Sequence, residues 1–141
     1  MFNASDALEF RVTDKNLRRP DGPSVLVVED HALIALDLEA ILLDLGAAEV
    51  VVANSVDKAL QLVATHVFDA ALVDIRIDRG TSLDVAVALR DKGVPFAFAS
   101  GYAIKEAFPA EFQTHLMIEK PYAERDVSAV WRALTSAGST R

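Results

Sequence analysis

The chain has 141 residues, enough for one domain with a substantial core, and 52% of them are hydrophobic. Its formal net charge of −7 makes free nucleic acid an unfavourable partner, and the absence of cysteine excludes disulfides, thiolate catalysis and cysteine-based zinc sites. No apolar run approaches the ~20 residues of a membrane span and residues 1–9 lack a secretory-signal pattern, so we predict a cytoplasmic protein without a membrane partner.

Residues 1–22 differ from the rest of the chain. They are mixed polar and end in a Pro-Asp-Gly-Pro cluster at 20–23 that is typical of a linker. We consider two interpretations: a flexible leader, or an arm that packs on the domain through Leu8, Phe10, Val12 and Leu17. We therefore divide the chain into an N-terminal arm or leader at 1–22, a domain at 23–137 and a C-terminal tail at 138–141.

The first predicted strand covers residues 24–28, and Asp30 is placed to cap the helix that follows. That helix ends at Gly46 and carries two apolar stripes on nearly opposite sides. The first stripe contains Ile34, Leu38, Ile41, Leu42 and Leu45, and the second contains Leu33, Leu36, Ala40 and Leu43. We expect the sheet to cover one stripe, and the N-terminal arm or a second subunit in a homodimer to cover the other.

The middle of the chain alternates strand and helix patterns. Strands are predicted at 49–53, 70–74 and 94–99, with a helix after Ser55 and another from Leu83 to Lys92. The 70–74 strand is followed by a loop through Gly80 to Ser82. Residues 103–112 have little helical periodicity, so we expect an irregular or mobile helix there.

The last predicted strand covers 116–119, and the final helix carries apolar residues at 127, 130, 131 and 134. Five strands alternating with helices predict an α/β fold, with a parallel sheet covered by helices on both faces. The carboxyl ends of parallel strands share one edge, where ligands bind in open α/β sheets.

Functional side chains stand at four of these strand ends: Glu29 with Asp30, then Asp74, Ser100 and Lys120. Clustered carboxylates repel one another unless a cation joins them, and all-oxygen ligands suit Mg²⁺. The alternative for Glu29 and Asp30 alone is a helix cap with a solvated charge. With a hydroxyl and an amine beside them, the carboxylates predict a phosphoryl-transfer site in which Asp74 is the nucleophile.

In this order and at these separations, the residues resemble a response-regulator receiver domain of two-component signalling, over about residues 24–137. The resemblance implies a flavodoxin-like three-layer fold with strand order 2-1-3-4-5. It implies that Asp74 accepts a phosphoryl group from a histidine kinase or phosphotransfer protein, and that Glu29, Asp30, Asp74 and the backbone carbonyl of Arg76 bind Mg²⁺. Ser100 and Lys120 would then hold the phosphoryl group and report its presence to the protein's surface.

Two positions depart from the family pattern. Three positions before the lysine, where the family usually has an aromatic switch residue, this chain has Met117. Four positions after the acceptor, where the family often has a proline, it has Asp78. Residues 95–102, Pro-Phe-Ala-Phe-Ala-Ser-Gly-Tyr, resemble the FAT GUY subgroup, which implies that Tyr102 takes over part of the switching. The alternative for Tyr102 is an ordinary half-buried aromatic.

The leading hypothesis is a stand-alone response regulator that changes its protein-binding surface on phosphorylation, with an unknown downstream partner. A pseudo-receiver, which binds proteins without phosphorylation, is the first alternative. An aspartyl-phosphate phosphatase is disfavoured because Arg76 stands where such enzymes need a second carboxylate. A flavin-binding protein is disfavoured because no phosphate-binding loop follows the first strand. His31 is expected to be an exposed first-turn residue and not a ligand.

Overall fold

The computed structural model describes residues 22–77, 80–100, 117–119 and 123–139, without the side chains of 76, 77, 80, 81, 100, 119 and 137–139. Five parallel strands form one sheet in the order β2-β1-β3-β6-β7. These strands are β1 (Ser24–Val28), β2 (Glu49–Ala53), β3 (Ala70–Asp74), β6 (Phe96–Ser100) and β7 (Met117–Glu119). The predicted order 2-1-3-4-5 is therefore confirmed.

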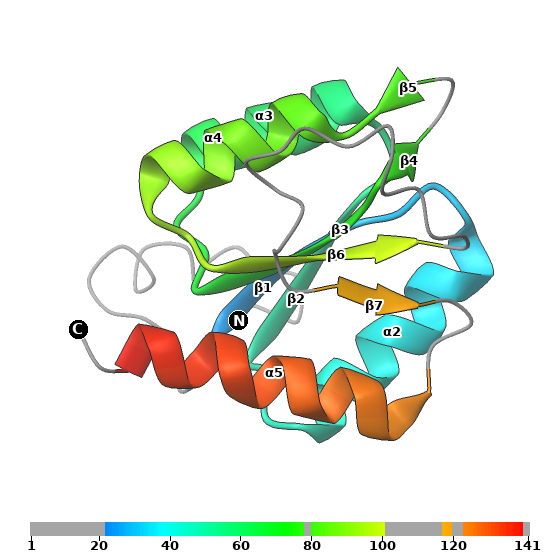
Figure 1. Ribbon diagram of the computed structural model, residues 1–141, viewed down its shortest axis with the longest axis vertical. Helices are drawn as coiled ribbons and strands as arrows, with labels where there is room; N and C mark the ends of the chain where they lie inside the picture. Colours follow the sequence, from blue (N-terminus) through cyan, green and yellow to red (C-terminus); the bar gives the residue numbers. More distant parts are fainter. Residues whose placement is uncertain (1–21, 78–79, 101–116, 120–122, 140–141) are drawn as a thin grey trace, which may run out of the picture.

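In the described part of the chain, four helices cover the two faces of the sheet (Figure 1). They are α2 (Ala32–Asp44), α3 (Val56–Thr65), α4 (Leu83–Lys92) and α5 (Glu124–Ser139). Helices α3 and α4 lie on one face, and α2 and α5 lie on the other (Figure 1). This is the three-layer arrangement expected when each helix buries one apolar side against a parallel sheet.

The buried strands divide their side chains between two cores because successive residues point to opposite faces. In β1, Leu26 and Val28 join the core under α3 and α4, and Val25 and Val27 join the core under α2 and α5. In β6 the two faces also differ in the size of their side chains. Phe96 and Phe98 lie on the α3/α4 side, and Ala97 and Ala99 lie on the α2/α5 side.

The two predicted helix caps had different outcomes. Ser55 is the N-cap of α3, and its hydroxyl accepts a hydrogen bond of 3.1 Å from the Lys58 amide, as predicted. The prediction for Asp30 was wrong, because the N-cap of α2 is His31 and makes no side-chain capping bond. Asp30 lies one residue too early. Instead, Glu29 Oε2 accepts a hydrogen bond of 3.0 Å from the His31 amide.

Only one of the two apolar stripes of α2 faces the sheet. Leu38 and Leu42 are buried in the α2/α5 core. In the second stripe, 77% of the Leu33 surface, 59% of Leu36 and 45% of Leu43 are exposed in the described part of the chain. The prediction that the sheet covers only the first stripe is therefore confirmed.

A short antiparallel hairpin, β4 (Arg76–Ile77) with β5 (Gly80–Thr81), replaces part of the loop predicted after β3. Two-residue strands are too short to leave a periodic signal in a sequence. Residues 103–112, expected to form a weak helix, lie outside the described residues, as does most of the N-terminal arm. Among the helices described, none combines the length and apolar character that a membrane crossing needs.

Candidate functional site

The carboxyl ends of β1 and β3 place two acidic residues on neighbouring strands. Val28 pairs with Val73 in the parallel register, so the next residues along each strand are Glu29 and Asp74. Neighbouring strands lie about 4.8 Å apart. Alternation along the strands directs both residues to the same side as α2 and α5. Both are buried, with 1% of Glu29 and 5% of Asp74 exposed.

Asp30 and His31 extend this acidic edge toward solvent. The ligand atoms of Glu29, Asp30 and His31 all lie within 4.8 Å of one another. His31 Nδ1 is 3.5 Å from Glu29 Oε2 and 3.6 Å from Asp30 Oδ1, and 72% of its side chain is exposed. His31 is thus exposed, as predicted, but it also lies beside both carboxylates.

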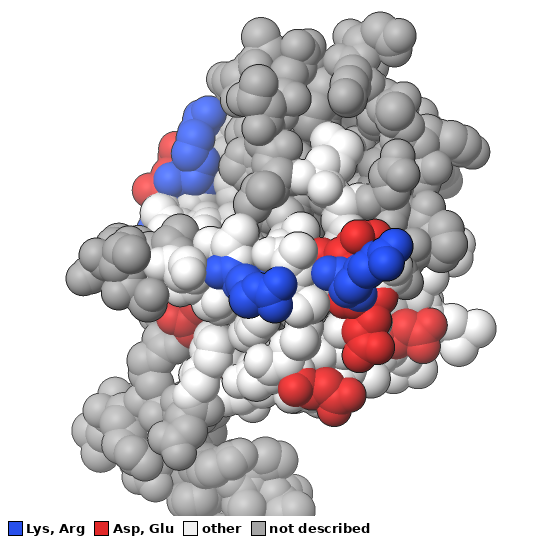
Figure 2. Space-filling view, turned by 60° about the horizontal axis from the view of Figure 1, so that its bottom comes forward, with Lys and Arg blue, Asp and Glu red and all other residues white. Residues whose placement is uncertain are grey.

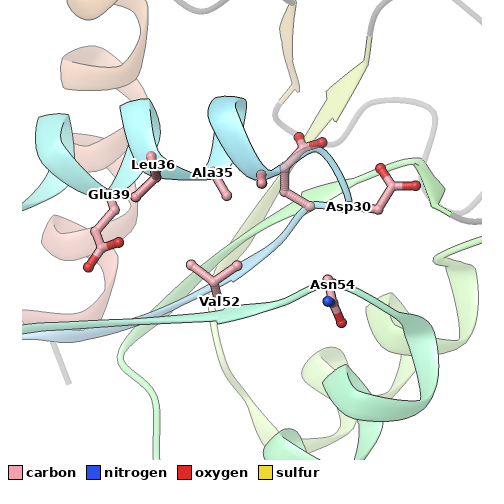
Figure 3. A pocket seen from close by; sticks show the side chains of 8 residues that line it. Asp30, Ala35, Leu36, Glu39, Val52 and Asn54 are labelled. Carbon is pink, nitrogen blue, oxygen red and sulfur yellow. The ribbon is translucent and has the colours of Figure 1, made fainter.

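The acidic pair also borders a shallow cavity of about 280 Å³ between α2 and the carboxyl end of β2 (Figure 3). Glu39, Val52 and Asn54 line the cavity together with the first two turns of α2. Asp30 lies at one end, and Leu36 and Glu39 lie toward the other (Figure 3). The site is therefore open to solvent on the α2 side.

Ser82 contacts the backbone of Asp74, and sequence reasoning missed it. Its side chain is buried, and its hydroxyl donates a hydrogen bond to the backbone carbonyl of Asp74. A second carbonyl, that of Ile75, lies 3.3 Å from the same hydroxyl and accepts a bond of 3.0 Å from the Ser82 amide. A serine directly before a helix is usually an N-cap, so no sequence signal marked this role.

The next strand, β6, completes the surroundings of Asp74. Asp74 pairs with Ala99, and the Ile75 amide donates a 2.9 Å hydrogen bond to the Ala99 carbonyl. Ala99 also lies in the α2/α5 core, so a methyl group is the side chain beside Asp74 in the register. A residue this small leaves room next to the carboxylate.

The remaining predicted site residues are placed only in part. Ser100 ends β6 and pairs with Glu119, and Arg76 pairs with Thr81 in the hairpin, but the Ser100 and Arg76 side chains are not described. Lys120 and Tyr102 lie outside the described residues. Met117 is half-buried and packs against the α3/α4 core.

The donor set fits a hard divalent cation. Glu29 and Asp30 offer carboxylate oxygens within one ligand sphere, and Asp74 follows on the adjacent strand. Mg²⁺ prefers a few carboxylates and keeps several waters, which the open α2 side admits. Thiolate ligands are excluded because the chain has no cysteine.

A flavodoxin-like sheet with a buried aspartate at the end of its central strand and an acidic pair at the end of the neighbouring strand defines the class of this protein: an α/β protein with an acidic site at one sheet edge. The family model for the response regulator receiver domain matches residues 25–131. The chain therefore belongs to the response regulator receiver domain family of two-component signalling.

Solved receiver structures have the same fold. A CheY-like receiver domain protein from Methanospirillum hungatei is 23% identical, with a TM-score of 0.75, over 84% of this chain and 98% of that chain. A receiver protein from Sinorhizobium medicae is 26% identical, with a TM-score of 0.73, over 83% and 97% of the two chains. A comparison with curated protein sequences gives no significant match.

Proposed function

We propose that this protein is a response regulator in which Asp74 accepts a phosphoryl group from the phosphohistidine of a histidine kinase or phosphotransfer protein. Phosphorylation changes the surface that the domain offers to a downstream protein. Its catalysis is limited to its own phosphorylation and dephosphorylation, in the cytoplasm. Family membership supports this proposal, and the adjacency of Glu29 and Asp74 in the β1–β3 register carries it.

The transfer forms one bond and breaks one bond. A carboxylate oxygen of Asp74 attacks the phosphorus, a P–O bond forms, and the P–N bond to the donor imidazole breaks. The released imidazole nitrogen keeps the electron pair and is protonated from solvent. Asp74 suits this role because only 5% of its surface is exposed, while the methyl group of Ala99 leaves space beside it.

Glu29, Asp30, Asp74 and the backbone carbonyl of Arg76 would hold Mg²⁺, which when bound offsets negative charge on the transferring oxygens. Glu29 is suited to a fixed position because its side chain is buried and one oxygen accepts the His31 amide hydrogen bond. Asp30 is more exposed than Glu29, so its carboxylate is suited to leave contact with water and bind the ion.

We assign phosphoryl contacts to the hydroxyl of Ser100 and the amine of Lys120. Ser100 ends β6 and Lys120 follows β7 in the sequence, and these paired strands extend the same edge of the sheet. Switching is assigned to Ser100 and Tyr102 together with Met117. A half-buried methionine at this strand start has no ring to rotate between an outward and an inward position, so Tyr102 carries the larger part of the switch.

The test is phosphorylation by a small phosphodonor such as acetyl phosphate, followed by intact-protein mass spectrometry with and without Mg²⁺. The wild-type chain should gain the mass of one phosphoryl group only with Mg²⁺, and Asp74→Asn should gain none. Asp84→Asn is the matched control, because it makes the same chemical change at an exposed position in the first turn of α4. Labelling of Asp74→Asn at the control rate would refute Asp74 as the acceptor.

A pseudo-receiver is the second candidate, and Met117 at the usual aromatic position favours it. Such a protein would keep the fold and bind its partner without phosphorylation. The same experiment separates the two functions, since a pseudo-receiver would stay unlabelled in the wild type. Failure of a beryllofluoride complex to bind in the presence of Mg²⁺ would decide for the pseudo-receiver.

A further inference from the structure

The exposed side of α2 carries an apolar stripe. Leu33, Leu36 and Leu43 lie at helical spacing on one side of the helix, and all three are exposed. In the described part of the chain, the other large hydrophobic residue with comparable exposure is Val67, which lies outside the helices. Hydrophobic exposure is thus concentrated on one helix, and such a patch marks an interaction surface.

Acidic residues accompany this apolar stripe. Asp37 and Asp44 are exposed and are separated by two helical turns on the same side as the leucines. Helix α2 contains no lysine or arginine. Figure 2, which brings the bottom of Figure 1 forward, shows acidic side chains gathered on one side of this face, next to basic side chains. The stripe therefore suits an occupant that is apolar and basic.

The chain enters the domain beside this helix. The Pro23 carbonyl accepts a 2.8 Å hydrogen bond from the Ala48 amide, just after the turn that ends α2. At Gly22, where φ is +95°, an added Cβ would lie 2.9 Å from the Gly46 carbonyl oxygen. The N-terminal arm, residues 1–21, therefore joins the domain next to the carboxyl end of α2.

The arm is long enough to follow the helix. The 13 residues of α2 span about 20 Å. An extended segment covers that distance with roughly six residues. The 21 residues before Gly22 exceed this requirement several times over.

The composition of the arm complements the stripe. Its central part, residues 8–19, contains four large apolar residues and four cations but only two acidic residues. The apolar residues are Leu8, Phe10, Val12 and Leu17, and the cations are Arg11, Lys15, Arg18 and Arg19. Apolar and basic residues are thus mixed in the arm, as leucines and aspartates are mixed on the exposed side of α2.

We propose that residues 8–19 of the N-terminal arm bind the exposed stripe of α2 in the same chain. The apolar residues cover Leu33, Leu36 and Leu43, and the cations lie beside Asp37 and Asp44. Leu36 also lines the cavity that Asp30 borders, so the bound arm forms one wall of the approach to the acidic edge. The contact does not depend on phosphorylation.

Engineered cysteine pairs test this contact in the full chain, which has no native cysteine. One variant combines Val12→Cys with Leu36→Cys, and a second combines Leu17→Cys with Leu36→Cys. The control pairs each arm cysteine with Gln61→Cys, an exposed position on α3 across the sheet. Circular dichroism confirms folding of each variant, and mass spectrometry under mild oxidation follows disulfide formation.

We expect an intrachain disulfide with residue 36 to form at least about tenfold faster than with residue 61 for at least one arm position, because binding raises the local concentration. Equal rates at 36 and 61 for both arm positions would overturn the proposal. Disulfides formed only between chains would also overturn it, and would identify a second copy as the occupant.

The charges can be tested in the same background. Replacing Asp37 and Asp44 by lysine (Asp37→Lys, Asp44→Lys) should slow formation of the faster intrachain disulfide by about threefold, because the introduced lysines repel the cations of the arm. An unchanged rate would show that the cations of the arm do not lie beside these aspartates, and would overturn that part of the proposal.

Discussion

Replacing Ser82 by alanine tests whether a buried hydroxyl holds the backbone of Asp74, the proposed phosphoacceptor. The variant removes the hydrogen bond to the Asp74 carbonyl and the longer contact with the Ile75 carbonyl. The Ile75 carbonyl keeps its 3.0 Å bond from the Ser82 amide, so the main loss falls on Asp74. Removing the donor from one buried carbonyl costs about 1–3 kcal/mol of folding free energy.

Urea unfolding measures this loss. The midpoint should fall with an unchanged m value, because the surface exposed on unfolding stays the same. Phosphorylation by acetyl phosphate should also slow, since the backbone of the acceptor is held less firmly. Ser128→Ala is the matched control, because it removes the same atom from a half-buried position where the hydroxyl contacts only the exposed Arg132 among the described residues. A Ser82→Ala variant as stable as Ser128→Ala would refute the reasoning.

Three further predictions follow from burial and contacts. Leu38→Ala should lower the free energy of unfolding by about 2–5 kcal/mol, because Leu38 lies in the core and is 1% exposed. Leu33→Ala, on the exposed stripe, should lower it by less than about 1 kcal/mol. Equal losses in thermal or urea unfolding would contradict the assignment of the two stripes. Trp131→Phe keeps most of the apolar packing but removes the indole donor 3.2 Å from the Leu45 carbonyl, so unfolding should show a loss of about 1 kcal/mol. Asp30→Asn should raise the Mg²⁺ concentration for half-maximal phosphorylation by about tenfold or more with little change in the unfolding midpoint, and an unchanged Mg²⁺ requirement would remove Asp30 from the metal site.

The fold could be predicted from the sequence because its strands are apolar and regularly spaced. The ranges 24–28, 49–53 and 70–74 are the strands observed. The boundaries of the strand predicted at 94–99 shifted by one or two residues, since Val94 and Pro95 are apolar neighbours of β6 but not part of it. Periodicity reports which residues are buried, and hydrogen bonding decides where a strand ends.

The site could be predicted only where it depends on strand ends. Glu29 and Asp74 meet because parallel register carries the residue after Val28 beside the residue after Val73. Ser82 could not be predicted, because its hydroxyl contacts a carbonyl eight residues back across a hairpin that has no periodic signal. The error at Asp30 has a related cause, since a helix start shifted by one residue moves the cap to His31.

The side chains that β6 gives to the two cores differ in size, and the acidic edge lies on the α2 side, where they are smaller. On the α3/α4 side, Phe96 and Phe98 pack edge to face with ring centroids 5.4 Å apart and fill the space along β6. On the α2/α5 side, β6 contributes only the methyl groups of Ala97 and Ala99, and the large side chain is Trp131 from α5. Since Asp74 pairs with Ala99, its carboxylate faces the side where β6 offers least bulk. A larger residue at 99 would occupy the space that a phosphoryl group on Asp74 needs, while leaving the sheet hydrogen bonds intact.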